Sequence, residues 1–323
     1  MHSMTSPVSP PAEDTWRLGV SLWVRDGATN DVDDLVEQAR QARDMGIRAV
    51  WFGQRFDLDS LSMAAIIGAL VPGLDVGTSI VPINPRHPLV VAGQAQTAQA
   101  ASHGRFTLGI GLGAPQIEVG AFGINQRRPI RRLREYLIAL RSLIETGAAD
   151  AHGDTLVAHP PMSAAVHGGN AISILVAAMG PQALAATGEL ADGTLPFLAG
   201  PRMLDGNIVP ALSQAAQHAG RTVRPRVVAA VVAVVTDDPE PVRRRAIDEL
   251  SFYESIPSYR RTLDYEGVQR AGELAVIGDE AHVTRELQHY RDAGATELLI
   301  TQTYLGGPAS QQRTWALLGS LAG

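Results

Sequence analysis

Three alternate glycines, Gly109, Gly111 and Gly113, stand at the end of an apolar run in the stretch GRFTLGIGLGAPQ, residues 104–116. Glycines in such a pattern can cradle a phosphate, make the tight turn of a dinucleotide-binding fold, or leave a strand end bare for a flat ring. A Walker-type phosphate loop also needs a lysine, and all 27 basic residues of this chain are arginines. The first possibility is therefore excluded in its usual form.

The dinucleotide-binding interpretation requires the spacing G-x-G-x-x-G between the first strand of a βαβ unit and the helix that follows it. Here the spacing is G-x-G-x-G, the strand is the fourth of the chain, and no helix is expected directly after Pro115. Two interpretations remain open. Either the glycines relieve crowding inside a strand, or they keep a strand end bare for a flat ring.

A second candidate site lies in AAMGPQAL, residues 177–184. Gly180 and Pro181 follow an apolar strand directly, and proline is suited to the first turn of a helix. The free N–H groups and the dipole of a helix N-terminus favour an anion. We therefore expect an anion at this position, with an ordinary strand-to-helix turn as the alternative.

Polar residues also follow two other expected strands. Gln54 and Arg55 end the second strand, and the segment NPRHP, residues 84–88, follows the third. Within it, Arg86 can bind a phosphate or carboxylate, and His87 can move protons near neutral pH. A histidine before a helix is as often a structural hydrogen-bonding residue, so both roles of His87 stay open.

The composition removes several classes of chemistry. The chain has no cysteine, which excludes thiolate nucleophiles, disulfides and Fe–S clusters, and no lysine for a Schiff base. Its nine histidines show neither HExxH nor another close ligand spacing, so the sequence predicts no metal site. The net charge of −6 argues against a nucleic-acid partner, and the arginine clusters at 127–134 and 243–245 are expected to be solvated helix faces.

The elements that must position these residues alternate between strand and helix. Apolar segments predict strands at 17–24, 48–53, 74–82, 105–111, 172–179, 192–197, 226–235 and 296–301. Helical periodicity predicts helices at 32–46, 60–71, 88–102, 131–146, 181–191, 208–220 and 311–321. Eight β/α steps indicate a (β/α)8 TIM barrel with an insertion after strand 4 and extra helices before strand 8; two stacked Rossmann domains are the alternative.

The chain is expected to form one domain, residues 16–323, behind a disordered tail. Residues 1–15 are rich in proline and serine and lack the apolar core of a signal peptide. No run approaches the roughly 18 apolar residues of a membrane span. These features predict a cytoplasmic protein with no membrane partner.

In this order and spacing, four segments resemble the bacterial luciferase-like flavin and deazaflavin oxidoreductases. They are GRFTLGIGLG around strand 4, VGTSIVPINPRHPLVVAGQAQTAQAASHGRF (76–106), LVAAMGPQALAATGELADGTL (175–195) and IGDEAHVTRELQHYRDAGATELLI (277–300). The RHP after strand 3 is similar to the actinobacterial F420-dependent branch. The resemblance implies a (β/α)8 barrel that binds FMN or the deazaflavin F420 at its C-terminal face, where F420 exchanges a hydride at C5.

The resemblance also implies cofactor-binding residues. Thr78, Ser79 and Ile80 would run beneath the ring, with a cis peptide bond between Ser79 and Ile80. Gly111 and Gly113 would border the same ring at the end of strand 4. The cofactor phosphate would be held by Ala178, Met179, Gly180, Pro181 and Gln182.

This chain departs from its relatives where they keep acidic residues and a histidine. It has Gln54 and Arg55 after strand 2, and Ala114 after the glycines. Arginine stays charged, and glutamine can only orient a partner through hydrogen bonds, so neither residue releases a proton near pH 7. His87 is therefore the predicted acid, Glu118 is the next candidate, and Gln54 and Arg55 are assigned to orientation and charge stabilisation.

Three functions follow from this sequence. The first is an F420-dependent oxidoreductase that moves a hydride to or from a small substrate with a C=N, C=C or carbonyl/alcohol group. The alternative is an FMN-dependent monooxygenase that receives reduced flavin from a partner reductase. The third is a barrel that only binds a ligand. A homodimer is expected through the apolar helix SLSMAAIIGAL, residues 60–70.

Overall fold

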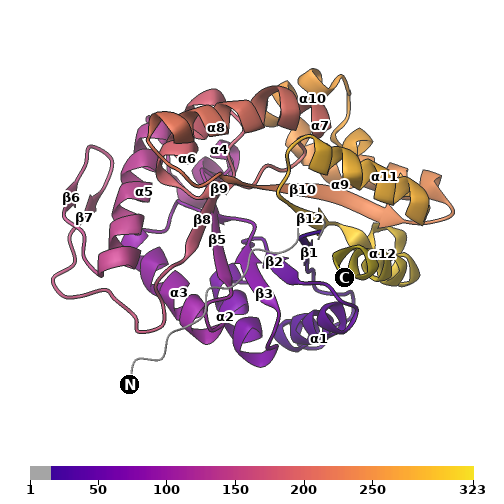
Figure 1. Ribbon diagram of the computed structural model, residues 1–323, viewed down its shortest axis with the longest axis horizontal. Coiled ribbons are helices and arrows are strands. Elements are labelled where there is room, and N and C mark those ends of the chain that lie inside the picture. The colour runs from indigo at the N-terminus through magenta and orange to yellow at the C-terminus, as the bar shows by residue number, and fades with distance from the viewer. Residues whose placement is uncertain (1–15) are drawn as a thin grey trace.

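Eight parallel strands close into a barrel in the computed structural model, which describes residues 16–323 (Figure 1). In chain order they are β1 Leu18–Ser21, β2 Ala49–Phe52, β3 Asp75–Thr78, β5 Phe106–Gly111, β8 Ser173–Val176, β9 Gly193–Thr194, β10 Arg226–Val235 and β12 Glu297–Thr301. Each strand pairs with the next, and β12 pairs with both β1 and β10. The pair β9–β10 completes the ring. The predicted TIM barrel is confirmed.

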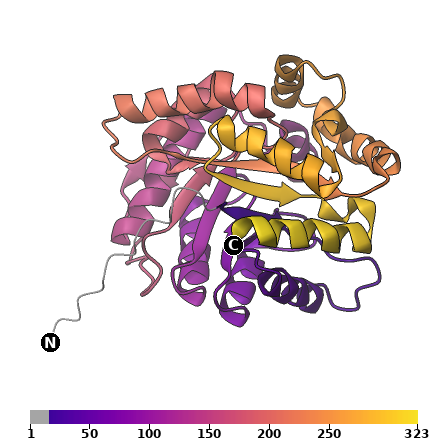
Figure 2. The ribbon, with the colours of Figure 1, turned by 45° about the vertical axis from the view of Figure 1, so that its right-hand side comes forward.

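Helices surround the strands in the order that the sequence predicts. They are α1 Asp31–Asp44, α2 Ser60–Leu70, α3 Pro88–Ala101, α5 Pro129–Thr146, α6 Pro181–Leu190, α8 Val209–His218, α11 Glu280–Asp292 and α12 Pro308–Ala322. The last helix, α12, lies beside α1 and closes the outer layer (Figure 2). Gly319 of α12 contacts the backbone of Met45 and Gly46 directly after α1.

Additional elements occupy the two regions where insertions were expected. After β5 come the helix α4 Pro115–Phe122 and, beyond α5, an antiparallel hairpin of β6 Ala151–His152 and β7 Val157–Ala158. After β10 come α9 Pro239–Glu254, α10 Pro257–Glu266, η2 Ala271–Leu274 and β11 Val276–Gly278. Shorter pieces are β4 Val81–Pro82, α7 Pro201–Met203, η1 Leu204–Ile208 and η3 Thr303–Gly306.

Local sequence explains the starts of three helices and the longest strand. The side chains of Asn30, Asp59 and Asp279 accept backbone N–H bonds at the starts of α1, α2 and α11, as N-cap residues do. The run RVVAAVVAVV forms β10 over its full predicted length, and nine of its ten residues are buried. A strand with helices on one face and the barrel interior on the other has no need for polar residues on alternate positions.

The barrel interior is apolar in its middle and polar at its N-terminal end. Trp51 fills the middle among Leu175, Leu195, Val228 and Leu299. At the N-terminal end, Arg226 forms an ion pair with Glu297 at 2.7 Å and donates to Ser173 Oγ at 2.8 Å. Interior residues of a TIM barrel form layers, so this end is a closed plug and not a pore.

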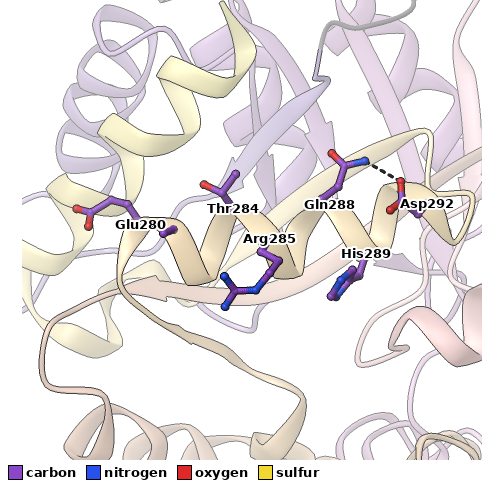
Figure 3. Close-up of a pocket in the computed structure, with 7 residues that line it drawn as sticks. Glu280, Thr284, Arg285, Gln288, His289 and Asp292 are labelled. Atoms are coloured by element: carbon purple, nitrogen blue, oxygen red, sulfur yellow. Dashed lines mark hydrogen bonds between the residues drawn. The ribbon is translucent and has the colours of Figure 1, made fainter.

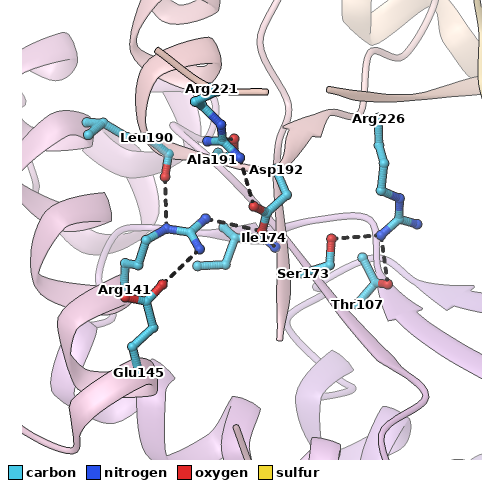
Figure 4. A network of polar contacts seen from close by, with 10 residues as sticks. All are labelled: Thr107, Arg141, Glu145, Ser173, Ile174, Leu190, Ala191, Asp192, Arg221 and Arg226. Atoms are coloured by element: carbon cyan, nitrogen blue, oxygen red, sulfur yellow. Dashed lines mark hydrogen bonds and ion pairs between the residues drawn. The ribbon is translucent and has the colours of Figure 1, made fainter. Parts of the chain in front are cut away.

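A network of arginines and one aspartate closes the same end from outside (Figure 4). Asp192, directly before β9, pairs with Arg141 and with Arg221 at 3.1 Å each and accepts the backbone N–H of Ile174 at 2.8 Å. These bonds connect α5 and the segment after α8 to the start of β8. The N-terminal face of the barrel is therefore devoted to stability.

The structure corrects several sequence-based boundaries. A helix, α4, does begin at Pro115, contrary to the expectation of none, and β11 was not predicted. The expected strand 74–82 is interrupted between β3 and β4, and the Ser79–Ile80 peptide bond there is cis, as predicted. The expected strand 192–197 pairs only at Gly193–Thr194 and at an isolated bridge between Phe197 and Ala230. Short β-strands depend on partners that local periodicity does not reveal.

Two further expectations concern the N-terminal tail and membrane-spanning helices. The tail predicted for residues 1–15 lies outside the described residues. Within the part that the structure describes, no helix is long and apolar enough to cross a membrane.

Candidate active site

The carboxyl end of the barrel has a floor of small side chains. Successive residues of a strand alternate between its two faces, so the residue two positions after an interior residue also faces the interior, one layer nearer the carboxyl end of the barrel. Such a residue follows each of the interior residues Gly19, Trp51, Leu175 and Leu299. These later residues are Ser21, Gly53, Ala177 and Thr301. These small side chains leave space above them at the carboxyl end of the barrel. The active sites of TIM barrels form at this end.

The three glycines of the opening motif serve close packing within the protein. A Cβ at Gly109 would collide with the carbonyl oxygen of Thr78, and one at Gly111 would lie 2.8 Å from Cδ1 of Ile80. Gly113 has a φ of +78°, and a Cβ there would lie 3.1 Å from an oxygen of Glu118. These contacts support the crowding interpretation for Gly109 and Gly111. A cofactor contact by Gly111 or Gly113 stays a prediction.

The segment Thr78–Ile80 is held firmly against the neighbouring strands. The hydroxyl of Thr78 donates to Gly109 O at 2.8 Å and accepts from Gly109 N at 2.9 Å, replacing the ladder where β3 ends. Ser79 N donates to Phe52 O at 2.8 Å. Ile80 is half-buried and packs on the interior cluster around Trp51. The segment is thus part of the site floor, although the Thr78 hydroxyl is already fully engaged.

The N-terminus of α6 is open to a ligand. Gly180 is its N-cap residue, with no side-chain cap, and a Cβ added there would meet no atom within 4 Å. Pro181 and Gln182 are exposed, Met179 is half-buried and Ala178 is buried. The turn begins one residue after Ala177 of the floor, so an anion at these N–H groups would lie at the rim of the barrel mouth.

Gln54 organises a polar cluster after β2. Its Oε1 accepts from Ser60 N at 3.2 Å and from Arg86 Nη1 at 2.9 Å, and its Nε2 donates to Arg55 O at 2.7 Å. Arg86 also forms an ion pair with Asp59. The amide of Gln54 therefore joins the ends of β2 and β4 and restrains the orientation of Arg86.

Arg55 points toward the side of the first strand. Its guanidinium pairs with Asp57 at 2.6 Å and lies 5.4 Å from the ring centre of Trp23, which in turn lies 5.9 Å from that of Tyr304. The Arg55–Asp57 pair holds the pKa of Asp57 below its ordinary value through the side-chain hydrogen bond. Because Asp57 already balances the charge of Arg55, the Arg55 guanidinium is not an unpaired cation for an anionic substrate.

Glu118 is buried in a second polar cluster, with 5% of its surface exposed. Its Oε1 accepts from Asn84 Nδ2 at 3.0 Å, and Asn84 Oδ1 accepts from Arg132 Nε at 2.8 Å. Through these two hydrogen bonds, Asn84 connects the Glu118 carboxylate on α4 to the Arg132 guanidinium on α5. This arrangement gives Glu118 a structural role, and its assignment as a proton donor stays a prediction.

Both ring nitrogens of His87 have backbone partners. His87 is the N-cap residue of α3: its Nδ1 accepts from Leu89 N at 3.2 Å, and its Nε2 lies 2.8 Å from Val157 O of the β6–β7 hairpin. These two bonds require the neutral tautomer with the proton on Nε2. They favour the structural alternative for His87, and its catalytic role stays a prediction.

Sequence reasoning missed an aromatic group around Phe197, which follows β9. Phe197 packs on the interior cluster, and its ring centre lies 5.1 Å from that of Tyr253 and 6.3 Å from that of Tyr259. Burial raises the pKa of both tyrosines. Neither phenol hydroxyl has a hydrogen-bond partner among residues 16–323. The motif SFYESIPSY, residues 251–259, carried the signal, but only the fold brings it to Phe197.

Two further polar groups were missed at the end of β12. Thr301, on the floor, is 7% exposed, and Gln302 next to it is 6% exposed. The hydroxyl of Thr301 and the amide oxygen of Gln302 are buried without a hydrogen-bond partner in the described part of the chain. Buried polar atoms normally have partners, so these two atoms are free to bond to a ligand or to water at this end of the barrel.

A hollow elsewhere on the molecule does not compete with this site. About 600 Å³ of open space lies along the outer face of α11, beside Glu280, Thr284, Arg285, Gln288, His289 and Asp292 (Figure 3). The side chains in Figure 3 project from one helix surface and belong to ordinary solvated positions, such as the Gln288–Asp292 hydrogen bond of 2.7 Å. No strand end contributes to this hollow, and it lacks the orphaned polar atoms of the barrel mouth.

Comparisons with known proteins agree with this geometry. The family model of luciferase-like monooxygenases matches residues 16–309. A Mycobacterium tuberculosis protein, provisionally named a coenzyme F420-dependent oxidoreductase, is 25% identical over 87% of this chain and 93% of its own length. The 5,10-methylenetetrahydromethanopterin reductase of Archaeoglobus fulgidus is 28% identical over 50% of this chain and 48% of its own.

Solved structures share the fold. An F420-dependent secondary alcohol dehydrogenase superposes with a TM-score of 0.78 at 17% identity, over 96% of this chain and 99% of its own. The FMN-bound oxygenating component of a Pseudomonas putida diketocamphane monooxygenase gives 0.75 at 17% identity, over 95% and 98%. The strands define a TIM-barrel protein, and its candidate ligand site lies at the carboxyl face. The chain belongs to the luciferase-like monooxygenase family.

Proposed function

We propose that this protein is an F420-dependent oxidoreductase acting on a small organic substrate with a C=N, C=C or carbonyl/alcohol group. The proposal is supported by the relative that matches 87% of the chain and is provisionally named an F420-dependent oxidoreductase. The relative from Archaeoglobus fulgidus, matched over half of the chain, is named a reductase, which is consistent with an oxidoreductase. Bound F420 would supply hydride transfer at C5 of its deazaflavin ring.

The observation that carries this proposal is the composition of the barrel mouth. A flat ring needs a low floor, which Ser21, Gly53 and Ala177 provide beside the Thr78–Ile80 segment. The unpaired hydroxyl of Thr301 could bond to such a ring. The open first turn of α6 can hold a phosphate through its N–H groups. The residues present therefore fit a flat cofactor with a phosphate.

Tyr259 is our candidate for the proton donor. Reduction of a carbonyl or imine leaves an oxygen or nitrogen that must take a proton, and general acid catalysis is worth about 10²–10⁴-fold. Burial raises the pKa of Tyr259, so its phenol is a weaker acid than an ordinary tyrosine and would donate its proton only to the strongly basic oxygen or nitrogen that hydride transfer creates. Thr262, one turn later on α10, lies 3.8 Å from the sulfur of Met179, which places this face of α10 beside the start of α6.

Other residues would orient rather than react. Gln54 restrains Arg86 at the ends of β2 and β4 while Asp59 balances its charge. Asn84, two residues before Arg86, restrains Glu118 in the same way. These two restrained polar clusters adjoin through residues 84–86, and they would fix the substrate relative to the cofactor ring.

The cofactor is tested by titration of the purified protein with oxidised F420 and, separately, with FMN, followed by fluorescence of each ring. We expect micromolar binding of F420 and none of FMN. Binding of FMN alone would replace the proposal by an FMN-dependent monooxygenase, an activity that the FMN-bound neighbour of the same fold carries in its name. Binding of neither would favour a barrel that only binds another ligand.

We also propose a homodimer. Most of the apolar surface of α2 is buried within the subunit, at Leu61, Met63, Ala64 and Ile67. Leu70 nevertheless remains 53% exposed and Val90 at the start of α3 remains 52% exposed, and Ile66, one turn before Leu70 on α2, is half-buried. A second copy would cover this outward apolar face of α2 and α3.

A further inference from the structure

The β6–β7 hairpin gathers three metal-ligating side chains on its outward face. Ala151 pairs with Ala158 and His152 with Val157, so the next step of the antiparallel ladder sets Asp150 opposite His159. Because side chains alternate along a strand, Asp150 and His152 share one face. All three side chains are exposed, whereas Ala158 on the opposite face is fully buried.

Their distances suit one metal ion. His152 Nε2 lies 3.0 Å and His159 Nδ1 lies 3.2 Å from Asp150 Oδ1, and the potential ligand atoms all lie within 4.8 Å of one another. Ligands held about 2.0–2.2 Å from a tetrahedral zinc ion are separated by about 3.4 Å. The two His–Asp separations lie within about 0.4 Å of this spacing, and the two imidazole nitrogens lie within 4.8 Å of each other.

We propose that Asp150, His152 and His159 bind a divalent transition metal ion of the zinc class. Two imidazoles and one carboxylate suit zinc and its neighbours rather than calcium or magnesium, which prefer oxygen ligands. The three protein ligands leave a fourth position for water or for a group of another molecule. This site is independent of the cofactor site at the barrel mouth.

The backbone beneath the ligands is already held in place. Leu156 is 7% exposed and packs on the core, and Glu135 of α5 accepts backbone N–H bonds from Asp154 at 3.1 Å and Thr155 at 2.8 Å. The hairpin also reaches α3 through Val157 O and His87. A metal ion would join the two strand ends, residues 150 and 159, and so clamp the ribbon that contacts His87.

The sequence hides this cluster because His152 and His159 are seven positions apart, outside the usual local ligand spacings. The expectation of no metal site rested on those spacings. A hairpin brings together residues at equal distances from its turn, so ligands on opposite strands meet regardless of motif. A search for local motifs does not detect this pairing across the hairpin.

The test is titration of tag-free, full-length protein with zinc chloride at neutral pH, in competition with a chromogenic chelator. We expect one equivalent to bind with a dissociation constant on the order of micromolar. Removing a residue that only hydrogen-bonds to a metal-ligating side chain weakens metal binding about 10–100-fold. A His152→Ala/His159→Ala double variant loses two of the ligating side chains themselves, so it should bind zinc at least about a hundredfold more weakly. The control His167→Ala changes another exposed histidine of the same connection and should bind normally.

Absence of stoichiometric zinc binding by the parent protein would overturn the proposal. Equal binding by the double variant would do the same, since the zinc would then be held by histidines elsewhere. Circular dichroism without zinc checks that all variants fold alike, as expected for exposed residues. Limited proteolysis gives a second readout: zinc should slow cleavage between residues 150 and 159 in the parent and in His167→Ala, but not in the double variant.

Discussion

Gly180 offers the sharpest residue-level test of the phosphate site. A side chain there meets no neighbouring atom, and both Asp and Asn are good N-cap residues, so Gly180→Asp and Gly180→Asn should fold normally. Only Asp adds a negative charge to the N–H groups that would hold the phosphate. We expect Gly180→Asp to weaken F420 binding at least about tenfold more than Gly180→Asn, measured by fluorescence titration. Equal affinities in the two folded variants would remove the phosphate from α6.

The proton donor can be assigned by comparing His87 with Tyr259. Asn can replace His87 as the N-cap residue of α3, so His87→Asn should keep turnover within a few-fold of the parent. Tyr259→Phe should lower turnover at least about a hundredfold while cofactor affinity stays unchanged. Tyr265→Phe is the control, since Tyr265 lies on the same helix and is 42% exposed. The reverse pattern, with His87→Asn inactive and Tyr259→Phe active, would make His87 the acid.

At the scale of elements, Glu135 attaches the β6–β7 hairpin to α5. Burial alone would raise the pKa of Glu135, but the Thr155 hydroxyl, Arg131 and two backbone N–H groups lower it to about 2. A carboxylate with a lowered pKa stabilises the folded state above its unfolded pKa, and this stabilisation is lost as pH falls from about 5 toward 2. The attachment of the hairpin should therefore depend on pH in the acidic range alone.

Glu135→Gln tests this dependence. At neutral pH it should lower the free energy of unfolding by roughly 1–2 kcal/mol, and the difference from the parent should shrink as the pH falls below about 4. Denaturant unfolding at several pH values measures it. The control is Glu145→Gln on the same helix, because the side chain of Glu145 is 56% exposed and, within residues 16–323, forms an ion pair only with Arg141. A difference that persists unchanged at low pH would show that the charge of Glu135 does not hold the hairpin.

At the scale of the whole molecule, the proposed homodimer predicts that a second copy covers the outward apolar face of α2 and α3. Light scattering at micromolar concentration should give the mass of two chains. Leu70→Asp adds a charge to an exposed apolar position and should shift the protein toward monomer with little effect on folding. The matched control is Ile138→Asp, which adds the same charge to an apolar residue of α5 that is 55% exposed. A parent protein that is monomeric at this concentration would contradict the proposal.

The sequence by itself determined the order of elements and the positions of several candidate residues. The apolar run 226–235 coincides with β10, and Pro181 starts α6 as predicted. These features depend on neighbours within a few residues, through periodicity, helix N-terminal preferences and the buried character of parallel strands. The placement of Gly180 at the carboxyl end of a strand, and hence at the functional end of the barrel, follows from the same local signals.

The tertiary structure alone decided how the candidate residues are used. Thr78 bonds to Gly109, 31 positions away, and His87 meets Val157, 70 positions away. Tyr259 meets Phe197, and Asp150 meets His159 across a hairpin. Such pairs form because barrel closure and hairpin register bring distant segments into contact, and no local pattern specifies their partners. The physical reason is that local preferences choose the elements, whereas the roles of side chains depend on contacts between elements.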